Sequence, residues 1–335
     1  MAVEDAFVIP TVDISPYLED PSSAASARVI EEVRQACVTS GFFQIVNHGL
    51  PKELRDGIFK AAETFFKLPL EEKKKMRVPV LMNRGYELIG SQALQADTMP
   101  DLKEGFFIGQ DIPADDPRSK AHPFLIGPNI FPPSIPDEAL KTPTEAYYAA
   151  VFALSCKVME ILARGLPYGD DVFGPFVSED PVCSIRLLHY PPQDSTDERQ
   201  LGAGAHTDFG AITLLLQDSS GGLEVQHPDT QTWIPVSPNA DAYVVNIGDM
   251  LAMWTKNAYK STVHRVVNRS GRDRYSVPFF FDGNTDVELR PFDGSAPAAA
   301  AARGGRALTA EEHMLVRYGE TYGRVGDERA VVAVG

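Results

Sequence analysis

The feature that most constrains the fold is a change in the character of the sequence after Pro181. Short runs rich in β-branched and aromatic residues follow one another there, separated by turns that contain Gly, Asp and Pro. These runs cover residues 182–190, 211–217, 243–247, 261–267 and 274–281. Many short strands joined by turns indicate a β-sandwich or barrel. We expect a double-stranded β-helix, or jelly roll, because the open end of that fold brings residues of distant strands together.

The segments on either side of these runs are predicted to be helical. Residues 23–39 and a segment that begins at Pro51 carry apolar side chains at helical spacing. Residues 142–145 have the form of a capping box before a long helix that ends near Gly165, and residues 308–322 are expected to form a closing helix. The Pro-, Asp- and Gly-rich stretch 100–140 is expected to be an irregular lid or connection. The fold class is therefore α+β.

Charge and cysteine content exclude several classes of partner. The formal net charge is -15, so nucleic acid and anionic membranes would be repelled. Three cysteines at wide spacing, without a CxxC pair, are typical of reduced thiols in a cytosolic protein. The N-terminus shows no signal peptide, and no window is expected to reach the roughly 18 apolar residues that a membrane span needs. We expect a cytoplasmic protein.

Two histidines and an aspartate form a candidate metal site. His206 and Asp208 are two residues apart, so in an extended strand their side chains leave the same face. His264 lies in another apolar run and could complete a triangular face of ligands, which is how Fe(II) is held with open positions opposite. An isolated HxD or a lone histidine in a strand is more often structural. Zinc is the competing metal, but the chain lacks an HExxH pattern, and iron is favoured.

Arg274 and Ser276 are also two residues apart, so in a strand their side chains leave the same face, and both are expected to face the interior. An arginine inside an apolar run needs an anionic partner to offset the loss of its hydration. A bound dicarboxylate would provide that partner, held by the guanidinium fork and the serine hydroxyl. The alternative is a structural ion pair with Asp273 or Asp282.

The run 182–190 is expected to add a third wall to the site. If Tyr190 faces the pocket, Leu188 and Arg186 do so as well. Arg186 is then a candidate anchor for a polar or anionic substrate, with a structural ion pair as the alternative. Phe280 shares the face of Arg274 and is either a wall beside the substrate or core packing.

Ordered motifs along most of the chain resemble those of the iron- and 2-oxoglutarate-dependent oxygenases of the isopenicillin N synthase-like family. The motifs are Ile9-Pro10-Thr11-Val12-Asp13-Ile14, residues 40–49, Phe65-Phe66-Lys67-Leu68-Pro69, Asn83-Arg84-Gly85-Tyr86, His206-Thr207-Asp208, Gly221-Gly222-Leu223, Asn246-Ile247-Gly248-Asp249, His264-Arg265-Val266 and Arg274-Tyr275-Ser276. The run 186–191 is most similar to fungal members. Leu188 stands where plant members often have Asn, so a co-substrate contact is not carried over there.

The resemblance implies specific roles. His206, Asp208 and His264 would bind Fe(II), Arg274 and Ser276 would hold the C5 carboxylate of 2-oxoglutarate, and Tyr190 would lie in the pocket. The substrate candidates are Arg186, Leu188, Phe280 and, in a lid formed by residues 80–110, Arg84, Tyr86 and Phe106. One catalytic domain, 1–335, is expected, with a mainly helical part (1–180), a jelly-roll core that carries both sites (181–292), and a flexible loop and C-terminal helix (293–335).

The implied activity is an oxygenase acting on a small molecule in specialised metabolism, through hydroxylation, desaturation or oxidative ring formation by a ferryl intermediate. It would use O₂ and 2-oxoglutarate as co-substrates and ascorbate as a stimulating reductant. Two alternatives stay open. One is an oxidase of the same fold that takes all its electrons from the main substrate, and the other is a jelly-roll binding protein without activity.

Overall fold

The computed structural model describes residues 7, 9–78, 83–193, 195–297 and 304–326. Two sheets form the core. The larger has eight strands, in the spatial order β1 (Thr11–Asp13), β2 (Phe42–Val46), β10 (Tyr243–Ile247), β7 (Ile212–Gln217), β12 (Arg274–Gly283), β5 (Val182–Tyr190), β4 (Glu104–Gly109) and β3 (Gly85–Glu87). The smaller has four, in the order β6 (Ala203–His206), β11 (His264–Val266), β8 (Leu223–Gln226) and β9 (Trp233–Pro235). The expected jelly-roll core is confirmed, because antiparallel pairing links β6 to β11, β11 to β8, and β7 to β10 and β12.

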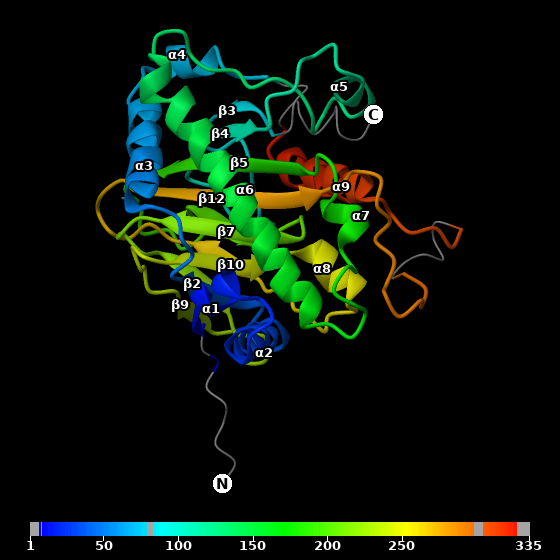
Figure 1. The fold of residues 1–335 in the computed structure, drawn as a ribbon. Helices are drawn as coiled ribbons and strands as arrows, with labels where there is room; N and C mark the ends of the chain where they lie inside the picture. The colour runs from blue at the N-terminus through cyan, green and yellow to red at the C-terminus, as the bar shows by residue number, and fades with distance from the viewer. Residues whose placement is uncertain (1–6, 8, 79–82, 194, 298–303, 327–335) are drawn as a thin grey trace.

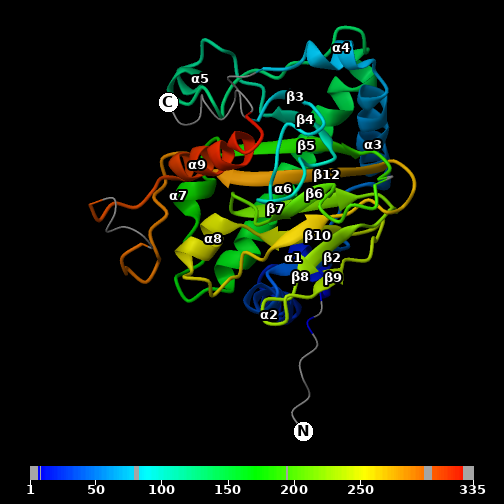
Figure 2. The same ribbon diagram turned by 180° about the vertical axis from the view of Figure 1, so that it is seen from behind.

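Helices surround this core. They are α1 (Ser15–Glu19), α2 (Ala24–Thr39), α3 (Lys52–Phe66), α4 (Leu70–Lys74), α5 (Pro117–Ala121), the 3₁₀ helix η1 (Asp137–Ala139), α6 (Lys141–Arg164), α7 (Gly174–Val177), α8 (Asp249–Trp254) and α9 (Ala310–Gly323). Figure 1 shows α3 and α6 on the outer face of the large sheet, and Figure 2 shows the small sheet on the opposite face. The helices expected at 23–39, from Pro51 and at 308–322 are thus present as α2, α3 and α9.

Helix α6 corrects two expectations. It is long and apolar enough to cross a membrane by length and composition, contrary to the expectation that no window qualifies, but it packs on α2, α3, β5 and β12 within the molecule. The predicted capping box does not form. The helix already begins at Lys141, so Thr142 and Glu145 lie inside it, and its N-cap residue Leu140 makes no side-chain cap hydrogen bond. A capping box does start α9, between Thr309 and Glu312.

The stretch expected to be an irregular lid is partly regular structure. β3 and β4 are paired strands of the large sheet, and β4 pairs with β5 so that Phe106 lies opposite Leu187 and Phe107 opposite Arg186. The strands β1 to β4, which come from the N-terminal half of the chain, thus extend the same sheet as β5, β7, β10 and β12. Between the two sheets lies a second, smaller apolar cluster that includes Phe42, Leu188, Tyr190, Val225 and Val266. The site described next opens into this space.

Candidate metal and co-substrate site

The pairing of β6 with β11 brings the two histidines together. His206 ends β6, His264 begins β11, and the two residues are direct partners in the register. Asp208 follows β6 by two residues. Its Oδ1 lies 3.6 Å from Nε2 of His206 and 3.6 Å from Nε2 of His264. One ligand atom from each of the three residues lies within 4.8 Å of the other two. Among the residues that the structure describes, these three are the His, Cys, Asp or Glu side chains that gather closely enough to hold a metal ion together.

Hydrogen bonds orient the three side chains. Nδ1 of His206 lies 2.7 Å from the Gly204 carbonyl, and Nδ1 of His264 lies 3.1 Å from the Thr262 carbonyl. Each ring therefore presents Nε2 to the common point, since a carbonyl oxygen can only accept and fixes the proton on Nδ1.

The carboxylate of Asp208 is fixed in the same way. Its Oδ2 accepts from the Thr213 hydroxyl at 2.5 Å and from the Asn246 amide at 2.7 Å, which leaves Oδ1 for a metal. Burial alone would raise the pKa of Asp208, but the electrostatic interactions with His264 and His206 and the hydrogen bonds hold it well below its ordinary value. Burial and the charge of His206 lower the pKa of His264 to about 4. A neutral imidazole and an ionised carboxylate are the forms that bind a metal.

The donor set fits Fe(II). Two imidazoles and one carboxylate on one side of a cavity are the ligands of the facial triad, which leaves positions open on the other side. The oriented outer hydrogen bonds match those of established metal sites. The metal would face the cavity that extends toward β12.

Arg274 and Ser276 lie deep in that cavity. The Arg274 side chain is 1% exposed and stacks on Tyr190, with Cζ 4.7 Å from the ring centre. Its Nε donates to the Gly221 carbonyl at 2.6 Å, its Nη2 to Gln217 at 3.3 Å, and its Nη1 to the Ser276 hydroxyl at 3.3 Å.

The structural ion pair considered for Arg274 is absent from the part of the chain that the structure describes. Asp273 pairs with His189, and Asp282 makes no ion pair with Arg274 there. A buried guanidinium whose contacts are all neutral is unusual, because its charge is costly to remove from water without an anion. The arrangement fits the carboxylate end of a bound co-substrate.

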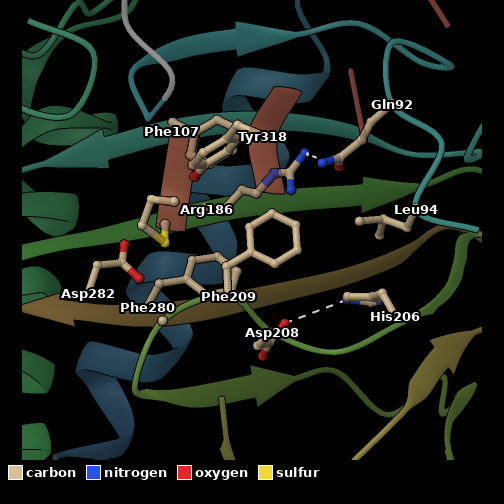
Figure 3. A pocket seen from close by; sticks show the side chains of 12 residues that line it. Gln92, Leu94, Phe107, Arg186, His206, Asp208, Phe209, Phe280, Asp282 and Tyr318 are labelled. Carbon is tan, nitrogen blue, oxygen red and sulfur yellow. Dashed lines mark hydrogen bonds and ion pairs between the residues drawn. The ribbon is translucent and has the colours of Figure 1, made fainter. Parts of the chain in front are cut away.

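The cavity consists of two adjoining compartments that share Leu94, Arg186, His206, Asp208 and Phe280. The co-substrate compartment also contains Leu188, Tyr190, His264, Arg274 and Ser276. The second compartment, drawn in Figure 3, is lined further by Gln92, Phe107, Phe209, Gly210, Asp282, Met314 and Tyr318. Its aromatic and thioether walls form an apolar chamber beside the metal ligands.

Arg186 lies between the compartments, where parity predicts it, and it is already paired. It forms a buried ion pair with Glu87, and its Nη2 lies 3.3 Å from Oε1 of Gln92. The guanidinium also covers the ring of Phe107 at 4.4 Å. The structural ion pair weighed as the alternative is therefore present, and Arg186 remains in the wall of the cavity.

Three substrate candidates lie elsewhere. Arg84 lines a separate small cavity near Cys183, where Nη2 donates to the Gln110 carbonyl at 2.8 Å. The Tyr86 hydroxyl donates to Glu104 at 2.6 Å, and Phe106 stacks on Phe65 with ring centres 4.0 Å apart. Side chains alternate along a strand, so Phe106 faces the helices, and its neighbour Phe107 faces the cavity.

Several residues of the site escape sequence reasoning. Thr213 and Asn246 fix Asp208, and Asp101 accepts from the Gly204 backbone N–H at 2.9 Å next to the metal ligands. A polar Asn246 inside the apolar run 243–247 was the available signal. Asp282 continues the alternating face of Arg274, Ser276 and Phe280 and could have been found by extending that rule.

The fold and the site together define a non-haem iron oxygenase, and comparison with known proteins agrees. Residues 9–134 match the family described as non-haem dioxygenase in morphine synthesis, N-terminal, and residues 181–283 match the 2OG-Fe(II) oxygenase superfamily. The chain belongs to the 2OG-Fe(II) oxygenase superfamily. Its cofactor is Fe(II) and its co-substrate 2-oxoglutarate, and its activity is that of a 2-oxoglutarate-dependent dioxygenase.

Fungal relatives resemble the chain along nearly its whole length. It is 49% identical to the 2-oxoglutarate-dependent dioxygenase citB of Monascus ruber, over 96% of this chain and 98% of that one. It is 42% identical to clavatol oxidase claD of Penicillium crustosum, over 95% and 97%. A Neurospora crassa protein, solved in complex with 2-oxoglutarate and thymine, has a TM-score of 0.78 at 30% identity, over 95% and 98% of the two chains. These likenesses support 2-oxoglutarate dependence over the oxidase and binding-protein alternatives.

Proposed function

We propose that this dioxygenase oxidises a small molecule of specialised metabolism, with hydroxylation as the default outcome and desaturation or ring closure where the substrate allows it. Relatives that bear the names citB, claD and tropC support the metabolic setting. The observation that carries the proposal is the buried Arg274 guanidinium, which lacks an acidic partner among the described residues and shares one cavity with the three metal ligands. That cavity continues into the second compartment, whose aromatic side chains lie beside the metal ligands.

Each group in the cavity has a distinct role in the proposed reaction. His206, Asp208 and His264 would hold Fe(II), which when bound couples O₂ reduction to the oxidative decarboxylation of 2-oxoglutarate. Arg274 and Ser276 would bind the distal carboxylate of 2-oxoglutarate, with Tyr190 stacked on the guanidinium.

The rest of the wall controls orientation and water. Thr213 and Asn246 keep Asp208 in one rotamer, so the ligand geometry exists before the metal arrives. Leu188 and Phe280 are buried or half-buried beside the site and exclude water from it. Placement and exclusion of water are the protein's contribution to such chemistry.

The test loads the protein with Fe(II) and 2-oxoglutarate without oxygen, then admits O₂ with a series of small aromatic and polyketide- or peptide-derived candidates, with and without ascorbate. We expect succinate in amounts that depend on the added substrate. Substrate oxidation without succinate would instead support the oxidase alternative.

We predict that Asp208→Ala removes both metal binding and turnover, because the carboxylate Oδ1 faces both Nε2 atoms at 3.6 Å. Metal binding is measured by calorimetry with Mn(II) and turnover by succinate release. The matched control is Asp229→Ala, which changes an exposed aspartate. A D208A protein with unchanged metal affinity would overturn the ligand assignment.

We further propose a cytoplasmic location. All three cysteines, Cys37, Cys156 and Cys183, are free thiols in the structure. Burial raises the pKa of the Cys37 and Cys183 thiols, which keeps them protonated and unreactive. Fractionation of cells that express a tagged copy tests this location, and recovery in the secreted fraction would contradict it.

A further inference from the structure

One face of β12 runs through both compartments. Arg274, Ser276, Pro278 and Phe280 line the co-substrate compartment, and Phe280 and Asp282 line the second one. These residues alternate along the strand, so their side chains leave the same face. The first two have a role in the proposed function, and Phe280 lines both compartments. Asp282, at the far end of the row, has none yet.

Asp282 is a buried acid in the wall of the second compartment. The residue is 3% exposed, and its Oδ1 has no hydrogen-bond partner among the described residues. Gly210 packs directly against it, since a Cβ there would lie 2.2 Å from Oδ1. Figure 3 shows the carboxyl group at the end of the chamber away from His206, with Phe209 and Phe280 between them.

Two polar side chains that line the same chamber are engaged with other residues. Arg186, the arginine that lines the chamber, is paired with Glu87. Gln92 uses its amide oxygen for Arg186 and its amide nitrogen for Thr321, at 3.1 Å. Native proteins seldom leave a buried carboxyl group without a hydrogen bond, because the lost hydration is not replaced. An unpaired acid in the wall of a ligand chamber therefore indicates a ligand that pairs with it.

We propose that Asp282 is a specificity-determining residue that hydrogen bonds to a hydroxyl group on an aromatic substrate. This inference rests on the proposed function and names the substrate class for the same site. The aromatic part follows from the walls, because Phe107, Phe209, Phe280 and Tyr318 surround the chamber. Rings of this kind favour stacked or edge-to-face partners.

The hydroxyl part follows from the chemistry of the chamber. A substrate carboxylate would meet the acid of Asp282 and an arginine that is already paired with Glu87. A substrate ammonium group would leave water for an apolar chamber at a higher cost than a hydroxyl group does. A hydroxyl group donates to a carboxylate and accepts from a carboxylic acid, so it fits either form. That property matters here because burial and the charge of Asp208 raise the pKa of Asp282 to about 7.

The experiment compares three probes of matched size: 4-methylphenol, its methyl ether 4-methylanisole, and 4-methylbenzylamine. Binding to the full chain loaded with Mn(II) and 2-oxoglutarate is measured by calorimetry, because this metal allows binding to be followed without turnover. We expect the phenol to bind about tenfold more tightly than the ether, the ratio typical of one hydrogen bond to a charged group. Equal affinity for phenol and ether, or tightest binding of the amine, would overturn the proposal.

Two substitutions and one control assign the effect to Asp282. In D282L we expect the preference for the phenol over the ether to disappear. In D282N, which keeps the shape of the side chain, we expect a smaller preference, because a neutral amide makes a weaker hydrogen bond than a carboxylate. D286N changes an exposed acid four residues along and should keep the full preference. If D282L does not fold, D282N alone decides, and an unchanged preference in either folded variant contradicts the proposal.

Failure of this inference differs from failure of the proposed function. The first titration, Mn(II) followed by 2-oxoglutarate, reports on the metal and co-substrate site before any probe is added. If both bind and the phenol shows no preference, only the role of Asp282 is lost. If 2-oxoglutarate does not bind, the proposed function fails. The ratio of the affinities for phenol and ether, measured on the unloaded protein, then still tests the role of Asp282.

Discussion

At the scale of single residues, the site depends on charges placed where water cannot reach them. Arg274 is surrounded by neutral acceptors and an aromatic ring, so its free energy in the unliganded protein is high and falls when an anion arrives. Asp282 is a second buried polar group of the same cavity, and the partner proposed for it is a hydroxyl group of the substrate. The two ends of one strand face are thus prepared for two different ligands.

Arg274→Ala is expected to raise the KM for 2-oxoglutarate by about 100-fold or more, since a buried bidentate arginine–carboxylate contact is among the stronger polar interactions. Steady-state succinate release against 2-oxoglutarate concentration measures it. Arg272→Ala, two residues earlier and exposed, is the matched control and should leave KM unchanged. A KM in R274A equal to that of R272A would move the anchor elsewhere.

Much of the site could be predicted from the sequence at this scale, and the reason is geometric. Alternation along a strand predicts that Arg274 and Ser276 share one face, and both line one cavity, whereas the prediction that Tyr190 lies there came from the family resemblance. Alternation cannot reveal a partner from another strand, so the ion pair of Arg186 with Glu87 and the bonds of Thr213 and Asn246 to Asp208 required the fold.

At the scale of elements, the turn that leads into β8 shapes the co-substrate pocket. Gly221 offers its carbonyl to Arg274, and Gly222 has φ 90°. A Cβ on Gly222 would lie 2.4 Å from the Val267 carbonyl oxygen, so this close approach of two backbones requires glycine.

Gly222→Ala is expected to destabilise the protein by about 3 kcal/mol or more and to raise the KM for 2-oxoglutarate, because strain and overlap displace the carbonyl that holds Arg274. Urea unfolding and steady-state kinetics measure the two effects. Gly271→Ala is the matched control. It has a similar φ of 71° but open space around it, so it should cost only about 1–2 kcal/mol and leave KM unchanged.

β5 is tied to its neighbours by a titratable bridge. His189 lies 2.8 Å from Glu104 of β4 and 2.8 Å from Asp273, just before β12. Burial alone would lower the pKa of His189, but the hydrogen bonds to Glu104 and Asp273 outweigh it and raise the pKa above its ordinary value. Protonation of this histidine therefore favours the folded state.

His189→Gln is expected to lose stability in a pH-dependent way. Because the pKa of His189 is higher in the folded protein, its contribution is fully present below the unfolded value of about 6.5 and is lost as pH rises through the folded value. The difference in unfolding free energy between wild type and H189Q should therefore shrink as the pH rises above about 6.5. A difference that stays constant or grows over this range would contradict the assignment.

Element prediction succeeded where apolar residues repeat and failed where pairing is non-local. The helices α2 and α3 show clear apolar faces, and β5, β10 and β12 are apolar runs, so each was found near its observed bounds. β4 is instead predicted to be part of a lid. It is a strand because it pairs with β5, and this pairing is distant in sequence: Phe107 of β4 lies opposite Arg186 of β5, 79 positions further along the chain.

At the scale of the whole molecule, the C-terminal helix closes the chamber from a distant part of the sequence. Met314 and Tyr318 of α9 line the second compartment, and the Tyr322 hydroxyl donates to Glu87 at 2.6 Å, across 235 positions of sequence. Arg317 adds an ion pair with Asp249. The sequence predicted the helix, but its apolar face could not indicate which part of the sheet it covers.

Tyr322→Phe is expected to lower the free energy of unfolding by about 2 kcal/mol, since it removes a buried hydrogen bond to a carboxylate. Urea denaturation measures this loss. Tyr168→Phe, at a tyrosine that is 40% exposed, is the control and should change stability by less than about 0.5 kcal/mol. Equal stability of the two variants would show that the hydroxyl of Tyr322 does not secure α9.

The single face of β12 has a consequence for how such enzymes diversify. Its first half, Arg274 and Ser276, faces the compartment proposed for the shared reactant, and its last residue of the row, Asp282, faces only the other compartment. Mutations near the end of the strand can therefore change the substrate that binds, while the binding site for 2-oxoglutarate stays unchanged. A family organised in this way can keep one half of a strand unchanged and vary the other. An exchange of residues 280–282 between relatives is therefore a minimal way to change which substrate is oxidised.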